Sequence, residues 1–153
     1  MYSNCVVNSN FKGEQPIDSN RLNKRQAKKA HFIKCFMDNT NIDVVSALDI
    51  DSHYLMSFLN PESINLSIVK PNQISIINAN NPLFAAKDNI KSFINTYGND
   101  FIIIDGIYKN KLATENWNKA IDNNDISISI SFYHFGLIST NNDFTKQDFV
   151  LRF

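Results

Sequence analysis

Apolar residues recur at helical spacing in the first part of the chain and at alternate positions in the second. After a lead-in at 1–19 that lacks periodicity, the pattern predicts a helix with Asn20 as its N-cap that runs to about Met37. Its apolar stripe consists of Leu22, Ala30, Ile33, Phe36 and Met37. Residues 42–59 show similar spacing, interrupted at 49–52, and predict two short helices. The first sixty residues are therefore expected to be mostly helical, with 1–19 loosely ordered.

From Asn60 onward the alternation of apolar and polar residues predicts strands. Two such strands are expected at 64–70 and around 74–76. Residues 101–104 are all apolar and precede Asp105, which is typical of a central strand covered on both faces. Isoleucine alternates with serine through 126–131, up to Phe132, and predicts a half-buried strand. Turns are expected at Gly136 and at 140–143, before a last strand at 149–153.

Two further helices are expected between these strands. Asn81 and Pro82 are suited to the N-cap and first position of a helix that Gly98 would end. A second helix at about 108–120 would bury Leu112, Ala113, Trp117 and Ala120. The predicted fold class is thus α+β, in which a helical N-terminal third packs on a small mixed β-sheet with two further helices. We expect a single domain over 20–153, with a helical part at 20–59 and a strand-rich part at 60–153.

The length and composition indicate an ordinary soluble protein. The 153 residues suit one domain, and with 43% apolar and 20% charged residues the chain can build a core. No unbroken apolar run exceeds four residues, as at 101–104, and the N-terminus lacks a signal-peptide pattern. We therefore expect a cytoplasmic protein without a membrane partner.

The cysteines and histidines are too scattered to predict a metal site or a disulfide framework. Cys5 and Cys35 are far apart in sequence, and the three histidines, at 31, 53 and 134, are isolated from one another. The 23 asparagines fit a general compositional bias and are not singled out. No catalytic residue, cofactor or metal ion is predicted.

Basic side chains are concentrated near the N-terminus. Residues 1–34 carry seven basic and two acidic side chains, while the rest of the chain carries eight basic and thirteen acidic ones. This asymmetry suggests a nucleic-acid contact through Arg21, Lys24, Arg25, Lys28 and Lys29. The alternative interpretation is that these residues form the solvated outer face of the first helix.

The junction between the 101–105 strand and the following helix is a second candidate site. A strand that ends in Asp105 and Gly106 and leads into a helix leaves backbone N–H groups that favour an anion. Lys109 and Lys111 would then reach a phosphate or a carboxylate. The alternative is that Gly106 only makes a tight turn and that both lysines point to solvent.

Three segments of the chain resemble the ParB/sulfiredoxin-like domain. They are 67–73 with its Pro71–Asn72 step, 87–98 ending in glycine, and the turn and helix at 103–113. The resemblance spans 64–131 and implies a phosphate- or nucleotide-binding turn at Asp105, Gly106 and Lys109. Together with Tyr108 and Lys111 beside them, these residues are the candidate phosphate or nucleotide site. The family has histidine and arginine where this chain has Tyr108 and Lys109, and lysine lacks the bidentate fork of arginine, which argues against nucleotide hydrolysis.

No strong catalytic motif is present, so the sequence favours a non-enzymatic protein. We expect an intracellular protein-interaction or accessory factor, of the kind that mobile elements carry, with an unknown protein partner. The alternative is a ParB-like module that binds phosphate, nucleotide or nucleic acid at the turn around Asp105 and Gly106. An enzyme with an unrecognised site is neither supported nor excluded by these patterns.

Overall fold

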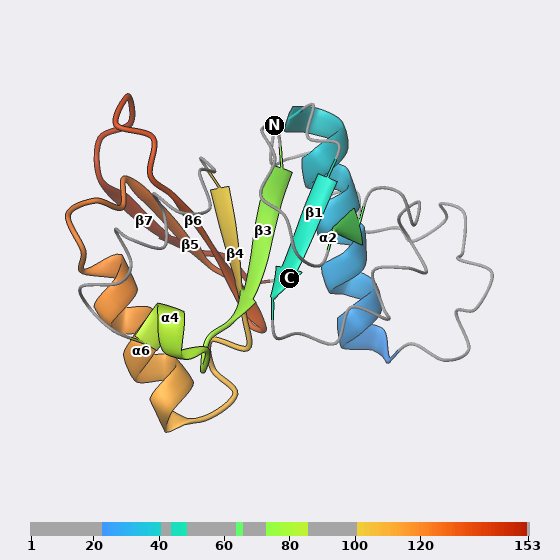
Figure 1. The fold of residues 1–153 in the computed structure, drawn as a ribbon, viewed down its shortest axis with the longest axis horizontal. Coiled ribbons are helices and arrows are strands. Elements are labelled where there is room, and N and C mark those ends of the chain that lie inside the picture. The colour runs from blue at the N-terminus through green and yellow to red at the C-terminus, as the bar shows by residue number, and fades with distance from the viewer. Residues whose placement is uncertain (1–22, 41–43, 49–63, 66–72, 86–100, 153) are drawn as a thin grey trace.

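The computed structural model describes residues 23–40, 44–48, 64–65, 73–85 and 101–152. These residues form helices on both sides of one β-sheet (Figure 1). In chain order the elements are α2 (Lys24–Thr40), β1 (Val44–Leu48), β2 (Ile64–Asn65), β3 (Gln73–Asn78), α4 (Pro82–Ala85), β4 (Phe101–Asp105), α6 (Lys111–Ile121), β5 (Ile128–Ser131), β6 (Phe135–Ser139) and β7 (Gln147–Val150).

The sheet is mixed and has the strand order β2-β1-β3-β4-β6-β5-β7. The first four strands of this order run parallel, β6 is antiparallel to both β4 and β5, and β7 is parallel to β5. Strand β4 is central: Ile103 lies opposite Ile76 on one side and Leu137 on the other. The predicted α+β class is confirmed.

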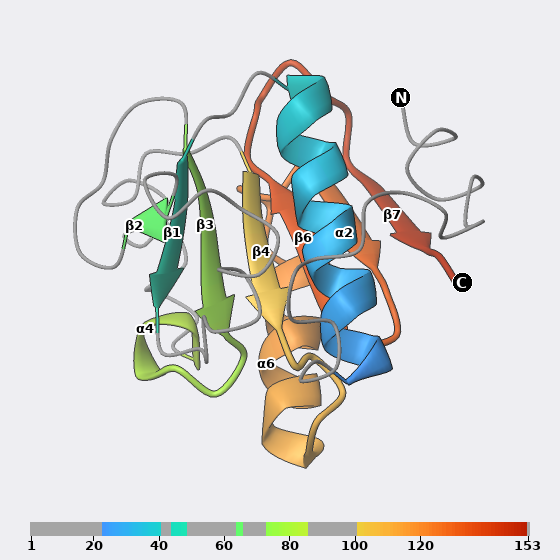
Figure 2. The ribbon, with the colours of Figure 1, turned by 90° about the vertical axis from the view of Figure 1, so that its right-hand side faces the viewer.

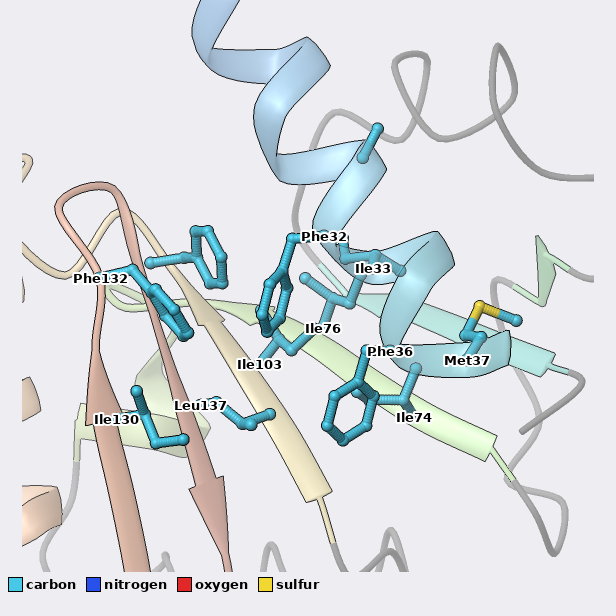
Figure 3. Close-up of a cluster of buried hydrophobic side chains, with 12 residues drawn as sticks. Phe32, Ile33, Phe36, Met37, Ile74, Ile76, Ile103, Ile130, Phe132 and Leu137 are labelled. Carbon is cyan, nitrogen blue, oxygen red and sulfur yellow. The ribbon is translucent and has the colours of Figure 1, made fainter. Parts of the chain in front are cut away.

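Helix α2 covers one face of the sheet. It contributes Phe32, Ile33, Phe36 and other apolar side chains to a cluster with the alternate residues of the strands below (Figure 3). The ring of Phe32 lies 4.8 Å from that of Phe132 and 5.0 Å from that of Phe135. These ring contacts hold the helix against the sheet. The side view in Figure 2 shows α2 in front of the sheet, beside the labels of β4 and β6.

Helices α4 and α6 cover the opposite face, where Trp117 is the largest buried side chain. Its ring lies directly over Gly136 of β6, and its indole N–H donates to the Ser131 hydroxyl oxygen at 3.0 Å. A Cβ atom at position 136 would come within 2.8 Å of Trp117 Cζ2. Gly136 is therefore a strand residue that admits the indole, and its predicted role as a turn is wrong.

The largest correction concerns the segment predicted as two helices at 42–59. Residues Val44–Leu48 form strand β1, which pairs in parallel with both β2 and β3. The β-branched Val44 and Val45 favour a strand, and pairing with β3 outweighs the helical spacing read from the sequence. The rest of that segment lies outside the described residues, as do the N-terminal lead-in and the predicted cap Asn20.

Several predicted boundaries and orientations change as well. The strand predicted through 126–132 is not half-buried, because Ser127, Ser129 and Ser131 are buried along with Ile126 and Ile130. The last strand begins earlier than predicted, at Gln147. Helix α6 begins at Lys111 rather than near 108, and Leu112 is 53% exposed instead of buried.

Other predictions agree with the structure. Strands β3 and β4 lie where the alternation and the apolar run place them, and α4 begins at Pro82. The remainder of that helix, to Gly98, and the predicted strand beyond Asn65 lie outside the described residues. Within the described ranges, no helix is both long and apolar enough to cross a membrane.

Candidate functional site

The first turn of α2 is fixed by a capping box. The Asn23 side-chain oxygen accepts from the Gln26 amide at 2.9 Å, and the Gln26 side-chain oxygen accepts from the Asn23 amide at 3.2 Å. These bonds satisfy amides that the start of a helix leaves unpaired. The helix consequently begins at Lys24, and Arg25 and Lys29 lie one turn apart on the same side.

Lys29 joins this helix to the end of β4. Its ammonium group forms an ion pair with the Asp105 carboxylate, and the two side chains are only 11% and 19% exposed. The Asp105 carbonyl oxygen also accepts from the Ala79 amide at 2.9 Å. Lys29 therefore does not belong to a solvated outer face: it holds the last residue of β4 against α2.

The turn after β4 uses its own hydrogen bonds. Gly106 adopts a φ of +74°, which favours glycine, and its amide donates to the His134 carbonyl oxygen at 2.9 Å. The Lys109 amide donates to the Gly106 carbonyl oxygen, also at 2.9 Å. The expectation that the backbone N–H groups here are open to an anion is therefore wrong for these two amides. The hydrogen bond to His134 instead ties the turn to the bend between β5 and β6.

The N-terminus of α6 is closed in a similar way. Asn110 is its N-cap, and the Asn110 side-chain oxygen accepts from the Ala113 amide at 2.8 Å. The Thr114 amide donates to the Asn110 carbonyl oxygen at 3.1 Å. An anion near this turn would thus be recognised by side chains rather than by these helix amides.

These elements enclose a cleft of about 960 Å³. Four parts of the chain line it: the start of α2, the turn after β4, the bend between β5 and β6, and the end of the chain beyond β7. In that order they supply Asn23, Arg25, Gln26 and Lys29; Asp105, Gly106, Tyr108 and Lys109; Ser131, Phe132, Tyr133 and His134; and Val150, Leu151 and Arg152. Residues of both sites predicted separately from the sequence thus line one cleft, Arg25 and Lys29 from the first and Asp105 to Lys109 from the second.

The cleft carries an excess of positive charge. Four basic side chains line it, Arg25, Lys29, Lys109 and Arg152, against the single carboxylate of Asp105. Since Lys29 and Asp105 neutralise each other, the excess comes from the other three basic residues. Such a concentration of one sign of charge in a concave surface attracts an oppositely charged ligand.

The positive charge of the cleft affects the pKa of His134. Burial lowers the pKa of its imidazole from the usual 6.5, and the nearby Arg25, Lys29 and Lys28 lower it further, whereas Asp105 acts in the opposite direction. The imidazole is therefore largely neutral near pH 7 and has one donor and one acceptor nitrogen.

Two tyrosine rings stand beside the cations. Tyr108 is 48% exposed and Tyr133 is 68% exposed, and both line the cleft. The Tyr133 ring contacts that of His134 edge to face, with centroids 4.6 Å apart. Exposed aromatic faces next to basic groups are suited to stacking with a planar ligand.

Not every predicted site residue reaches this cleft. Lys111 is 93% exposed and lies 3.8 Å from Glu115 on α6, outside the lining. Lys24 and Lys28 line a smaller hollow of about 340 Å³ beside the cleft, together with Arg25 and Lys29. Arg21 lies outside the described residues.

Among the nine lining residues that the sequence interpretation missed are Asn23, Gln26, Tyr133, His134 and Arg152. The spacing of Asn23 and Gln26 is that of a capping box, so this pair had a readable signal. The other three come from distant parts of the chain and carry no local pattern. They are found only once the sheet brings β5, β6 and β7 beside the end of β4.

In the part of the chain that the structure describes, no three histidine, cysteine, aspartate or glutamate side chains are grouped so that they could hold a metal ion. A scan against protein-family models, a search of curated proteins and a search of solved structures each gave no match. The resemblance to the ParB/sulfiredoxin-like domain therefore stays a prediction, and the function is argued from the geometry of the cleft.

Proposed function

We propose that this protein binds a phosphate-bearing ligand, a nucleotide or a short single strand of nucleic acid, in the cleft between α2 and the turn after β4. The observation that carries this proposal is the convergence of basic residues far apart in sequence. Arg25, Lys109 and Arg152 come from three different parts of the chain and line one concave surface. Basic residues that only keep the surface solvated are usually spread over it and do not gather in one cleft.

Side chains of this kind are well matched to phosphate. The two arginines carry planar guanidinium groups that can bind phosphate through two hydrogen bonds, and Lys109 adds a point charge. The ion pair between Lys29 and Asp105 holds α2 next to the turn, so Arg25 and Lys109 keep their relative positions before a ligand arrives. Less ordering is then needed on binding, which favours affinity.

The tyrosines favour a ligand that carries a base. A stacked base is worth about 1–3 kcal/mol per aromatic side chain in proteins that bind single strands. Tyr108 and Tyr133 are exposed next to the cations, on the two bends that the hydrogen bond from Gly106 to His134 joins. The cleft, at about 960 Å³, is as large as the bigger small-molecule sites in proteins and has room for a nucleotide.

Binding is tested by fluorescence anisotropy with a short labelled oligonucleotide at low salt, with CTP, ATP and GTP as competitors. Lys109→Gln and Arg25→Gln should each weaken binding by about 10- to 150-fold, the range for one hydrogen bond to a charged group. Lys111→Gln and Lys34→Gln remove the same charge outside the cleft and should change affinity only slightly. If a mononucleotide displaces the labelled oligonucleotide, the ligand is a nucleotide. If none of the three does so, the ligand is a single strand of nucleic acid.

Two results would contradict the proposal. One is the absence of any binding by oligonucleotide or nucleotide at low salt, where electrostatic attraction is strongest. The other is an equal loss of affinity in the cleft variants and in the two controls, because that would indicate non-specific attraction to the total charge rather than to the cleft.

Protein interaction is a second candidate function, and one observation favours it. Strand β7 lies at an end of the sheet, its four residues are all exposed, and Phe149 and Val150 are apolar. Exposed sheet edges are templates for pairing with another strand. Sedimentation velocity over a wide concentration range tests this function, and a strict monomer that binds no other chain would count against it.

A further inference from the structure

Strand β7 has one neighbour among the described residues, the parallel strand β5. The amides of Gln147 and Leu151 donate to the carbonyl oxygens of Ser127 and Ser131, at 2.8 and 2.9 Å. Because backbone groups alternate in direction along a strand, odd-numbered residues here bond to β5. The N–H and C=O groups of Asp148, Val150 and Arg152 consequently point away from β5, to the outer side of the sheet.

Charged residues on an edge strand usually discourage pairing with another strand. In β7 their effect depends on the register, because the register determines which charges lie opposite each other. Antiparallel pairing of the 146–152 stretch with a second copy of itself has three registers that pair at least five of its residues and place outward residues opposite outward residues. If Asp148 lies at the two-fold axis of the pair, the two Asp148 carboxylates lie opposite each other. If Phe149 lies at the axis, Lys146 lies opposite Arg152 of the other copy. Both of these registers oppose like charges.

The third register, centred on Val150, has the opposite electrostatic character. It places Asp148 of each chain opposite Arg152 of the other, so that two ion pairs form. Val150 faces its own copy at the two-fold axis, and Phe149 lies opposite Leu151. Opposite charges and apolar pairs directly across antiparallel strands each stabilise the pairing.

We propose that β7 pairs antiparallel with β7 of a second copy of this chain, with Val150 at the two-fold axis and Asp148 opposite Arg152. The sheet would then continue from one subunit into the other, and both subunits would use the same surface, as in most two-fold dimers. This inference rests on the second candidate function and names its partner. Because Arg152 also lines the cleft, the pairing would share its guanidinium group between Asp148 of the second copy and the ligand of the cleft.

The dimer would also bring the two clefts close together. Val150, Leu151 and Arg152 line the cleft, so each cleft ends at the strand that pairs. A single strand of nucleic acid that leaves one cleft would then meet the basic surface of the next. Two linked sites of this kind raise the apparent affinity for a long ligand over that for a short one.

Charge reversal tests the register, with light scattering after size exclusion and sedimentation equilibrium as the measurements. Asp148→Arg and Arg152→Asp each place like charges opposite each other and should each shift the protein towards monomer. The double variant restores two opposite-charge pairs and should recover the dimer. Asp143→Arg, an exposed position outside β7, makes the same charge change and should leave the dimer unaffected.

A proline substitution tests the role of the outer backbone groups. Val150→Pro removes an N–H group that points away from β5, so the bonds within the subunit remain and only pairing with a second copy is lost. Circular dichroism should report an unchanged fold while the protein becomes monomeric. If this variant does not fold, the charge-reversal pair alone decides the question.

Two outcomes overturn the inference. A wild-type chain that stays monomeric at the highest attainable concentration excludes the pairing, and with it the partner named here. A dimer that persists in both single variants, or that the double variant fails to recover, excludes this register. In that second case the general function in protein interaction stands, because association would still occur through another surface.

Discussion

His134 shows at the residue scale how the charge of the cleft acts on a single group. Its imidazole lies at the bend between β5 and β6, and its carbonyl oxygen accepts the hydrogen bond from Gly106. Burial and three basic neighbours disfavour the imidazolium and lower the pKa of His134 below 6.5, while Asp105 partly offsets them. The same field would favour a phosphate group, whose arrival should raise the pKa again.

The pKa of His134 gives the first prediction at this scale. The unfolded chain takes up a proton as the pH falls through 6.5, while the folded chain does so only at lower pH. The contribution of His134 to the free energy of unfolding should therefore decrease as the pH falls from 6.5 to the folded pKa, and this contribution should not change further below it. NMR titration of the imidazole should show a midpoint below 6.5 that Arg25→Gln raises and Asp105→Asn lowers further. A midpoint unaffected by either change would contradict this account.

Gly136 gives a second prediction, about packing. Gly136→Ala would force a methyl group against the Trp117 ring, and overpacking of this kind destabilises proteins by about 1–3 kcal/mol. Urea unfolding measures the change. In a Trp117→Phe background the smaller ring leaves room, so the same substitution should be less destabilising. Equal losses in both backgrounds would show that the indole is not what excludes a side chain at position 136.

At the element scale, buried polar contacts connect the helices to the sheet. The Lys29 ion pair fastens α2 to β4, and the buried Asn116 side chain of α6 donates to the Ala79 carbonyl oxygen at 2.9 Å, just beyond β3. Each contact joins elements that are far apart in sequence. Because such polar contacts are directional, they define the orientation of each helix on the sheet more strictly than apolar packing does.

The Asn116 contact can be tested with a neighbour on the same helix. Asn116→Ala leaves the buried Ala79 carbonyl oxygen without this donor and should lower the free energy of unfolding by about 1–3 kcal/mol. Asn118 is exposed on α6, so Asn118→Ala should change stability by less than about 0.5 kcal/mol. Equal effects in chemical denaturation would mean that helix propensity, rather than the buried bond, explains the loss.

The elements also show what the sequence can and cannot predict. Strands β3 and β4 were predicted because burial on the sheet leaves a local apolar pattern, and α6 was predicted in part because its buried residues recur at helical spacing. Strand β1 was misread because its neighbours β2 and β3 follow it in the chain, and pairing with them is not encoded locally. The capping box of Asn23 and Gln26 was readable from the spacing of the two residues, but Asn20 was chosen as the cap.

At the scale of the whole molecule, the strand order decides where the chemistry gathers. The sheet places the bend between β5 and β6, and the end of β7, next to the carboxyl end of β4. Arg25, Lys109 and Arg152 therefore line the same cleft although long stretches of chain separate them. The sequence indicated basic residues on the first helix and at the turn, and it had no means of showing that they face one cleft.

The most direct test of the proposed binding function is an NMR titration of the labelled wild-type chain with a short single-stranded oligonucleotide. We predict that the amide signals that shift belong to four separate stretches, around Arg25 to Lys29, Asp105 to Lys109, Ser131 to His134 and Val150 to Arg152, and that added salt reverses the shifts. Signals that shift elsewhere on the surface, or no shifts at low salt, would contradict the proposal that this cleft binds phosphate.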